Sequence, residues 1–236
     1  MTSEYVGADN LELMTGAVNY NRYLLRMVLN QTRDKEDHVL DVGAGNGLFA
    51  RELAQFDIRV SCVEPDVNQA KTIAAAGLGV FPAIDEIDDL SVDYLYSLNV
   101  LEHIQDDLGA LQQWQLKIKP GGRMLLYVPA FQSLFSSMDR KVGHYRRYRA
   151  KGLAALVAAA GFKVQKVRYV DSAGFIASLI YKLVGSQEGT INRTALLFYD
   201  RVIFPLSRLG DIFLSRFVGK NVYVVAIKPA NQREEM

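Results

Sequence analysis

The sequence predicts an α/β fold built on a doubly wound, mostly parallel sheet. Val39–Val42 is a short run of strand-forming residues that leads into the glycines Gly43, Gly45 and Gly47, and a helical pattern begins at Leu48. Glycine suits this turn because the backbone there visits positive φ angles and a side chain would keep a ligand away. Further along the chain, short apolar strands alternate with helical segments, which is the pattern of βαβ units.

Length, charge and cysteine content narrow the class of protein. Half of the 236 residues are apolar, enough for a sizeable core, so we expect a single domain over residues 1–236. A net charge of +1 gives no general attraction for nucleic acid, and we expect no such partner. The single cysteine, Cys62, excludes an internal disulfide and a cysteine zinc cluster, and we predict no metal site. The first nine residues lack the apolar core of a signal peptide, so we expect a cytoplasmic protein.

A helix is expected over Asn10–Thr32, because apolar residues recur there at helical spacing and a polar turn follows. The helix contains a polar and aromatic patch at Asn19–Tyr23. This patch is either ordinary helix surface or a cover for a ligand, in which Tyr20 would make the contact. We therefore expect residues 1–37 to form an N-terminal helical cover.

Acids stand at the ends of the first two strands. Asp41 lies just before the glycine turn, where a carboxylate suits an ammonium group or hydroxyls better than phosphates. The second strand, Arg59–Val63, ends at Glu64, about 20 residues after the glycines, where an acid can accept hydrogen bonds from both ribose hydroxyls. The alternative for Glu64 is a solvated loop residue. Pro65 stops the strand before the next helix, Val67–Ala76.

The rest of the sheet follows from short apolar runs that turn residues separate. We expect further strands at Gly79–Pro82, Val92–Leu98, Arg123–Val128, Phe162–Val170 and Val222–Lys228, and further helices at Leu108–Ile118 and Leu153–Ala160. Roughly 50 residues separate the last two strands, which is too many for a plain loop. Within them Phe175–Val184 and Ile191–Val218 have helical patterns, and Pro205 divides the second segment into two helices.

The glycine turn and two later segments match a known pattern. Asp41 and the three alternating glycines resemble the first motif of class I methyltransferases that use S-adenosylmethionine (SAM), whereas a dinucleotide fingerprint places its third glycine one residue later. Asn99–Ile104 and Lys119–Gly122 are similar to later landmarks of the same family. The resemblance covers Val39 to about Tyr169. It implies a Rossmann-like seven-stranded sheet whose last strand is antiparallel, here with a helical insertion between strands six and seven.

The resemblance also implies where SAM binds. The backbone near Asn99 is expected to meet the methionine part, and Ile84, with Asp85 as the weaker candidate, is expected to meet adenine. His103 is expected to pack or hydrogen-bond locally rather than to act in catalysis. The predicted cofactor-binding residues are Asp41, Gly43, Gly45, Asn46, Glu64, Pro65, Ile84, Asp85, Asn99 and Tyr20.

The densest charge feature is Asp139–Lys151, in which six lysines and arginines are interleaved with a histidine and two tyrosines. It is either a solvated basic turn or part of a substrate site. Its Gly143–Tyr148 segment resembles a motif of bacterial methyltransferases encoded near glycan- or lipid-modifying enzymes. We predict that Arg147 binds a carboxylate or phosphate, that His144 can take a proton, and that Tyr148 completes the catalytic group.

These features together predict a SAM-dependent methyltransferase whose acceptor is a small or lipid-like molecule with an anionic group, methylated on oxygen. Methylation on nitrogen or carbon, and a SAM-binding regulatory or assembly protein without catalysis, are the alternatives. An NAD oxidoreductase is disfavoured by the glycine spacing. Residues 172–221 are expected to form a helical lid over the acceptor site. A homodimer surface and a peripheral contact with the inner face of the membrane rank below the lid.

Overall fold

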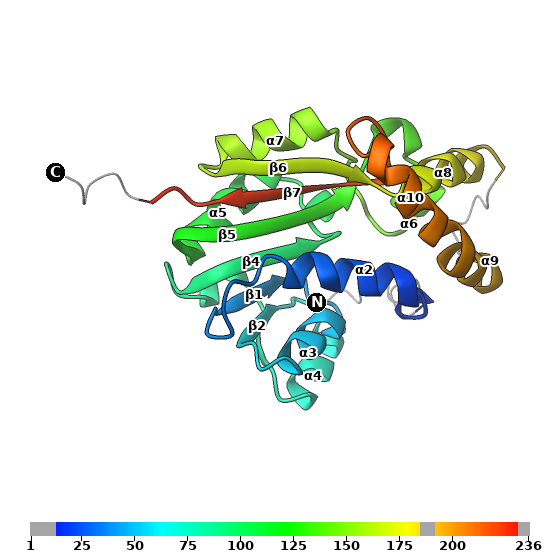
Figure 1. Ribbon diagram of the computed structural model, residues 1–236. Coiled ribbons are helices and arrows are strands. Elements are labelled where there is room, and N and C mark those ends of the chain that lie inside the picture. Colours follow the sequence, from blue (N-terminus) through cyan, green and yellow to red (C-terminus); the bar gives the residue numbers. More distant parts are fainter. Residues whose placement is uncertain (1–12, 185–191, 231–236) are drawn as a thin grey trace.

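The computed structural model describes residues 13–184 and 192–230 and has the predicted fold class (Figure 1). The strands are β1 (Val39–Val42), β2 (Val60–Val63), β3 (Gly79–Phe81), β4 (Val92–Leu98), β5 (Ile118–Pro129), β6 (Lys163–Val170) and β7 (Asn221–Ile227). They form one seven-stranded sheet in the order β3-β2-β1-β4-β5-β7-β6. Strands β1 to β5 pair in parallel, and β7 runs antiparallel to both of its neighbours, as predicted.

Helices cover both faces of this sheet. They are α2 (Val18–Leu29), α3 (Leu48–Ala54), α4 (Val67–Ala75), α5 (Asp107–Lys117), α6 (Ser137–Lys141), α7 (Ala150–Ala159), α8 (Ser172–Val184), α9 (Arg193–Phe198) and α10 (Phe204–Leu214). Apolar residues of α5 and α7 pack with the strands in one core cluster, and those of α2, α3 and α4 pack in a second cluster on the other face. Among the described residues, no helix is both long and apolar enough to cross a membrane.

The glycine turn after β1 has the backbone that the sequence predicts. Gly43, Gly45 and Gly47 have φ angles of 76°, 56° and 74°, a region that glycine enters at little steric cost. A Cβ on Gly43 would lie 2.3 Å from Cγ2 of Val100, so the two loops that follow β1 and β4 are in close contact. Asn99, just before Val100, also has a positive φ of 56°.

The helices between β6 and β7 gather at the carboxyl ends of the parallel strands (Figure 1). We refer to residues 171–220 as the insertion. It leaves and rejoins the sheet at neighbouring points, since Val170 of β6 pairs with Asn221 of β7. Pro205 stands in the first turn of α10, where its missing N–H is not needed, and a π-helical turn at Tyr199–Ile203 joins α10 to α9.

Two buried aspartates hold the insertion together and fasten it to the N-terminal helix. Oδ2 and Oδ1 of Asp211 accept hydrogen bonds from the backbone of Asp171 (2.9 Å) and Ser172 (2.8 Å). The carboxylate of Asp200 accepts from the backbone N–H groups of Asn19 (3.0 Å) and Tyr20 (2.9 Å), which belong to the first turn of α2. Asp200 therefore caps a helix whose first turn lies 181 residues earlier in the chain.

Some predicted boundaries change. The N-terminal helix is interrupted at Gly16 and α2 begins at Val18; its predicted start at Asn10 lies outside the described residues, as does the predicted helix start at Ile191. The basic segment opens with a short helix, α6, which the sequence analysis did not predict because it did not recognise the capping residues of that helix. Asp139 and Ser136 cap that helix reciprocally.

Candidate functional site

A cavity of about 1520 Å³ opens at the carboxyl ends of the strands. The glycine turn forms one side of it, and helices α8 and α9 form the other. Pockets for a single small ligand usually measure about 300–1,000 Å³, so this one has room for a cofactor and a second molecule. The N-terminal segment contributes Tyr20 to the wall.

The structure brings most of the predicted cofactor residues together in this cavity. Those that line it are Asp41, Gly43, Gly45, Asn46, Glu64, Pro65, Asn99 and Tyr20. Ile84 and Asp85 do not line it. They lie in a 3-10 turn after β3, where Ile84 packs against the core and Asp85 is exposed. Their expected contact with adenine stays a prediction.

Glu64 is held in place at the end of β2. Its side chain is nearly buried, and its oxygens accept hydrogen bonds from the backbone N–H of Gly45 (2.7 Å) and of Asp66 (2.9 Å). Burial raises the pKa of Glu64, and these two hydrogen bonds oppose the shift. A carboxylate fixed in this way still has lone pairs that can accept from ligand hydroxyls.

Asp41 is a buried carboxylate at the floor of the cavity, 3% exposed. Its Oδ2 accepts a hydrogen bond from the hydroxyl of Tyr96 at 2.7 Å. Burial raises the pKa of Asp41 to about 7, although the Tyr96 hydrogen bond opposes this, and the charge of Glu64 adds to it. A cationic group in the cavity would favour the ionised form of Asp41.

The other end of the cavity is organised by Asp139, which is 1% exposed. Its Oδ1 lies 2.8 Å from Nδ1 of His144 and 2.7 Å from Nε of Arg147, and its Oδ2 accepts from Nη2 of Arg147 at 2.9 Å. Although burial opposes it, the hydrogen bonds from His144 and Arg147 hold the pKa of Asp139 well below its usual range. The paired donors of Arg147 are thus engaged by Asp139, which corrects the prediction that they are available to clamp an anionic substrate.

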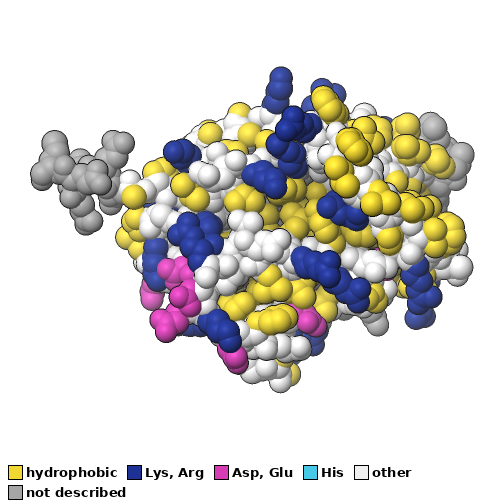
Figure 2. Space-filling view, viewed as in Figure 1, with side chains coloured by type: hydrophobic (Ala, Val, Ile, Leu, Met, Phe, Trp, Pro, Cys, Tyr) yellow, Lys and Arg dark blue, Asp and Glu magenta, His cyan; other side chains and the backbone are white. Residues whose placement is uncertain are grey.

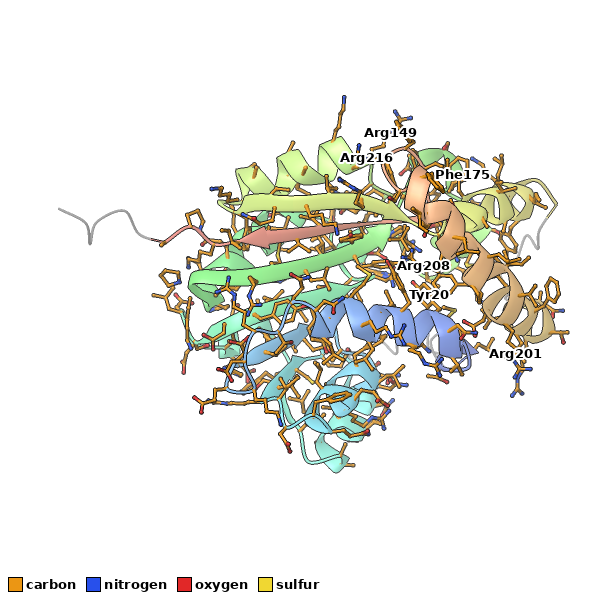
Figure 3. All side chains as sticks on the ribbon, viewed as in Figure 1. Tyr20, Arg149, Phe175, Arg201, Arg208 and Arg216 are labelled. Atoms are coloured by element: carbon orange, nitrogen blue, oxygen red, sulfur yellow. The ribbon has the colours of Figure 1, made fainter. Side chains whose placement is uncertain are left out.

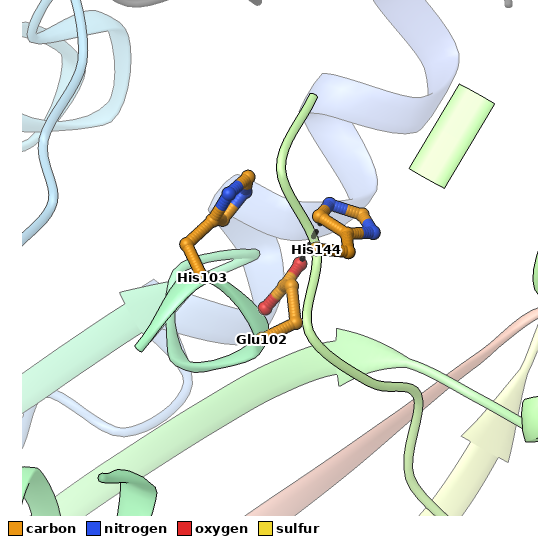
Figure 4. Close-up of side chains that lie close together, drawn as sticks. All are labelled: Glu102, His103 and His144. Atoms are coloured by element: carbon orange, nitrogen blue, oxygen red, sulfur yellow. Dashed lines mark ion pairs between the residues drawn. The ribbon is translucent and has the colours of Figure 1, made fainter. Parts of the chain in front are cut away.

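The other ring nitrogen of His144 lies on the side of Glu102 and His103, which belong to the turn after β4 (Figure 4). Nε2 of His144 lies 3.7 Å from Oε1 of Glu102, and the rings of His103 and His144 meet edge to face with centroids 4.5 Å apart. Burial raises the pKa of Glu102 to about 8 and lowers that of His103 to about 4. All three side chains line the cavity.

Tyr148 is not brought to the cavity, which corrects its predicted place in the catalytic group. Its ring belongs to the hydrophobic core, and its hydroxyl donates to Oδ2 of Asp107 at 3.0 Å. Arg146 also pairs with Asp107, at 2.8 Å. The end of the Gly143–Tyr148 motif therefore fastens the loop to α5, while its histidine faces the cavity.

Among the residues of the cavity wall that sequence reasoning missed are Glu102, Asp139 and Lys220. Glu102 belongs to the family-like segment after β4, and Asp139 is an acid beside a run of cations, so both carried a signal that was not used. Lys220 carried none, because its place depends on how the insertion returns to β7. Burial lowers the pKa of Lys220, and the charge of Asp171 opposes the shift.

A family model described as a methyltransferase domain matches residues 17–167. The chain belongs to this methyltransferase family. Together with the fold, this membership confirms the predicted class I SAM-dependent methyltransferase.

Curated relatives of this methyltransferase match it over part of their length. An uncharacterized methyltransferase from Mycobacterium avium (strain 104) is 33% identical over an alignment of 121 residues, and the match covers 45% of each chain. A ubiquinone biosynthesis O-methyltransferase from Xanthomonas euvesicatoria pv. vesicatoria is 26% identical over an alignment of 98 residues, and the match covers 37% of this chain and 41% of the relative. The matched segments thus span less than half the length of these relatives.

Solved structures share the fold over most of the chain. A SAM-dependent methyltransferase from Archaeoglobus fulgidus aligns with a TM-score of 0.61 at 17% identity, covering 89% of this chain and 93% of that one. Phosphoethanolamine N-methyltransferase 2 from Haemonchus contortus, in complex with SAM, also aligns with a TM-score of 0.61, at 18% identity, covering 88% of this chain and 52% of that one. At these identities the likeness is one of fold.

Proposed function

We propose that this methyltransferase transfers the methyl group of SAM to a hydroxyl oxygen of a lipid-like acceptor that carries an anionic group. The observation that carries the proposal is the single cavity that joins the glycine turn to the inner face of the insertion, whose outer face is apolar and basic. The relative named as a ubiquinone biosynthesis O-methyltransferase supports oxygen as the atom methylated.

The cofactor lies against the glycine turn. Gly43 and Gly45 have no side chains and line the cavity with their backbone, which fits close contact with the methionine part of SAM. Glu64 accepts hydrogen bonds from the ribose hydroxyls, and Asp41 contributes the negative charge that a cationic ligand favours. When bound, SAM supplies a methyl group on a positively charged sulfur.

The acceptor lies at the opposite end, where Lys220 replaces Arg147 as the residue proposed to meet its anionic group. Lys220 lies half-buried in the cavity wall, and an anionic group nearby would favour its charged form. Arg147 instead fixes Asp139 and, through it, the orientation of His144. Because methyl transfer is an in-line displacement, alignment of the acceptor oxygen is the main task of this wall.

Helix α8 connects the cavity with the outer surface. Residues on one side of it line the cavity, and residues on the other side are exposed apolar side chains, in the alternation expected of a helix. The first set is Gly174, Ala177, Ser178 and Tyr181, and the second is Ile176, Leu179 and Ile180. An apolar tail of the acceptor could therefore contact the exposed side of α8 while the rest of the acceptor lies in the cavity.

The outer face of the insertion is unusually apolar for a surface in water. The side chain of Phe213 is 78% exposed and that of Phe217 is 73% exposed. Ile212, Leu209, Leu206 and Phe198 are also well exposed on this face. Figure 2 shows hydrophobic side chains gathered over the part of the molecule where α8, α9 and α10 lie. An apolar face of this size marks a contact with another apolar phase or partner.

The charges on the insertion favour a membrane as that phase. In its described part, 171–184 and 192–220, the acids Asp171, Asp200 and Asp211 are all buried. The exposed charged side chains there are basic, and Arg201 and Arg216 mark opposite ends of the insertion (Figure 3). Exposed aromatic and aliphatic groups with a basic margin are typical of surfaces that lie in the headgroup region of anionic membranes.

The function can be tested with SAM that carries a labelled methyl group and an organic-solvent extract of bacterial lipids. We expect labelled methyl in a lipid fraction together with release of S-adenosylhomocysteine, and fragmentation that places the methyl on oxygen. The Glu64→Ala variant should lose this activity. SAM binding without turnover would support the non-catalytic alternative, and a label on nitrogen or carbon would contradict O-methylation.

A further inference from the structure

We propose that Glu102, His103 and His144 form a binding site for a divalent transition-metal cation at the acceptor end of the cavity. Each offers one donor atom, and these atoms all lie within 4.8 Å of one another (Figure 4). Two of the residues come from the turn after β4, and the third comes from the loop between α6 and α7. The inference deepens the proposed O-methylation, and its catalytic part rests on that function.

The first argument is the state of the Glu102 carboxylate. The side chain is fully buried, and no other described residue donates a hydrogen bond to either of its oxygens. The nearest basic atom is Nε2 of His144, at 3.7 Å, which is beyond hydrogen-bond distance. A cation would stabilise the ionised form of a carboxylate buried in this way, and the space between it and the two imidazoles is where one would lie.

The second argument is that each imidazole is already held in place by a hydrogen bond. His144 is bonded through Nδ1 to Asp139, and that carboxylate is itself fixed by Arg147 and by the backbone of Ser136. His103 is engaged by a hydrogen bond with the backbone of Val142. Histidines that bind metals nearly always use their second nitrogen in this way, on a carboxylate or a backbone carbonyl.

The donor set indicates the kind of ion. Two imidazoles and one carboxylate favour zinc, iron(II), manganese or cobalt over magnesium and calcium, which prefer oxygen ligands. Three protein ligands leave coordination positions open, as in catalytic rather than structural sites. These positions face the cavity, because all three side chains line it.

The site gives the acceptor hydroxyl a way to lose its proton. With a cation held there, an acceptor hydroxyl bound to it would have a lowered pKa and would release its proton to water. The oxygen lone pair then forms the bond to the methyl carbon while the carbon–sulfur pair returns to sulfur, which leaves as a neutral thioether. The three residues thereby act as ligands that hold the cation, and Asp139 acts as a positioning residue.

Cobalt(II) is the probe for the first experiment, because its visible absorption reports the ligands directly. The full-length protein is stripped with a chelator, dialysed and titrated with cobalt(II), and bound metal is counted by elemental analysis. We expect about one equivalent, with absorption of a site of low coordination number. The variants Glu102→Gln, His103→Ala and His144→Ala should each bind at least ~10-fold more weakly.

The chain contains its own control. His38, the third histidine, lies outside the cluster and contacts the carbonyl of Ser91 and the hydroxyl of Ser61, so His38→Gln should bind cobalt like the wild type. Asp139→Asn should weaken binding by ~10- to 100-fold while leaving all three ligands in place. Circular dichroism and SAM titration of each variant show that it is folded.

Two outcomes would overturn the metal site. One is the absence of cobalt binding at millimolar concentration in protein that binds SAM, and the other is equal cobalt affinity in wild type, His103→Ala and His144→Ala. Methyl transfer by fully stripped protein would reject the role of the metal in catalysis and would leave the proposed function intact. Loss of transfer in metal-loaded protein that binds SAM would count against the proposed acceptor instead.

Discussion

At the scale of single residues, Glu64 gives the most direct test of the cofactor site. Glu64→Ala should weaken SAM binding by about 2 kcal/mol, because charge-assisted hydrogen bonds to two hydroxyls are lost. Glu86→Ala is the matched control, since Glu86 is an exposed acid outside the cavity lining. Titration calorimetry on both variants measures the difference. Equal effects of the two substitutions would mean that Glu64 does not bind the ribose.

Asp41 should make the stability of the SAM-free protein depend on pH. Burial raises its pKa in the folded state from the ordinary 3.8 to about 7, so between these pH values the folded chain keeps a proton that the unfolded chain has lost. The stability linked to that proton is present below pH 4 and is lost as the pH rises through 7. Asp41→Asn, which cannot ionise, should therefore gain on the order of 3 kcal/mol relative to wild type between pH 5 and pH 8.

Urea denaturation of both proteins at a series of pH values measures this difference. The titratable groups that interact with the charge of Asp41 are Glu64, Cys62, Tyr94 and Tyr96, and all four remain in the variant. A stability difference that does not change with pH would show that Asp41 is ionised throughout.

At the scale of secondary-structure elements, Asp200 joins the two covers of the cavity. Its carboxylate caps α2 while its own backbone belongs to the π-helical turn of the insertion. Asp200→Ala should cost about 1–3 kcal/mol of unfolding free energy, because two backbone N–H groups lose their acceptor. It should also weaken SAM binding, because Tyr20 lies in the first turn of α2 and would move with that helix. Asp88→Ala, at an exposed loop position, is the control. Unchanged SAM affinity in a destabilised variant would limit Asp200 to a structural role.

The elements were predictable where local rules decide them. Val92–Leu98 is a strand because its apolar run is buried on both faces, and α4 begins after Asp66 because that side chain accepts from two backbone N–H groups of the first turn. The role of Arg147 was not predictable in the same way. A basic run looks alike whether its arginines face water or a buried acid, and only the fold places Asp139 beside Arg147. The burial of Tyr148 depends in the same way on its distant partner Asp107.

At the scale of the whole molecule, the insertion should direct the protein to anionic membranes. We expect it to float with vesicles that contain anionic phospholipid and to remain behind with purely zwitterionic ones. The double variant Phe213→Ser, Phe217→Ser should lose most of this binding, whereas Phe56→Ser, which changes an exposed phenylalanine before β2, should not.

Flotation at two protein concentrations, with sedimentation of the free protein, separates this prediction from its rival. If Phe213 and Phe217 instead cover a second copy of the chain, the wild type will sediment as a dimer, the double variant as a monomer, and neither will follow the vesicles. Binding that is independent of lipid charge would also contradict the role given to the exposed basic residues.

The pairing of Val170 with Asn221 has a consequence for how acceptor preference can change. A segment whose two ends are neighbours in one sheet can be exchanged without moving any strand, because ring closure depends only weakly on the length between the ends. Under the proposed function, in which the insertion forms the acceptor end of the cavity, acceptor preference is then separable from cofactor binding. A transplanted segment would need to carry its own equivalent of Asp200, whose carboxylate accepts hydrogen bonds from the first turn of α2.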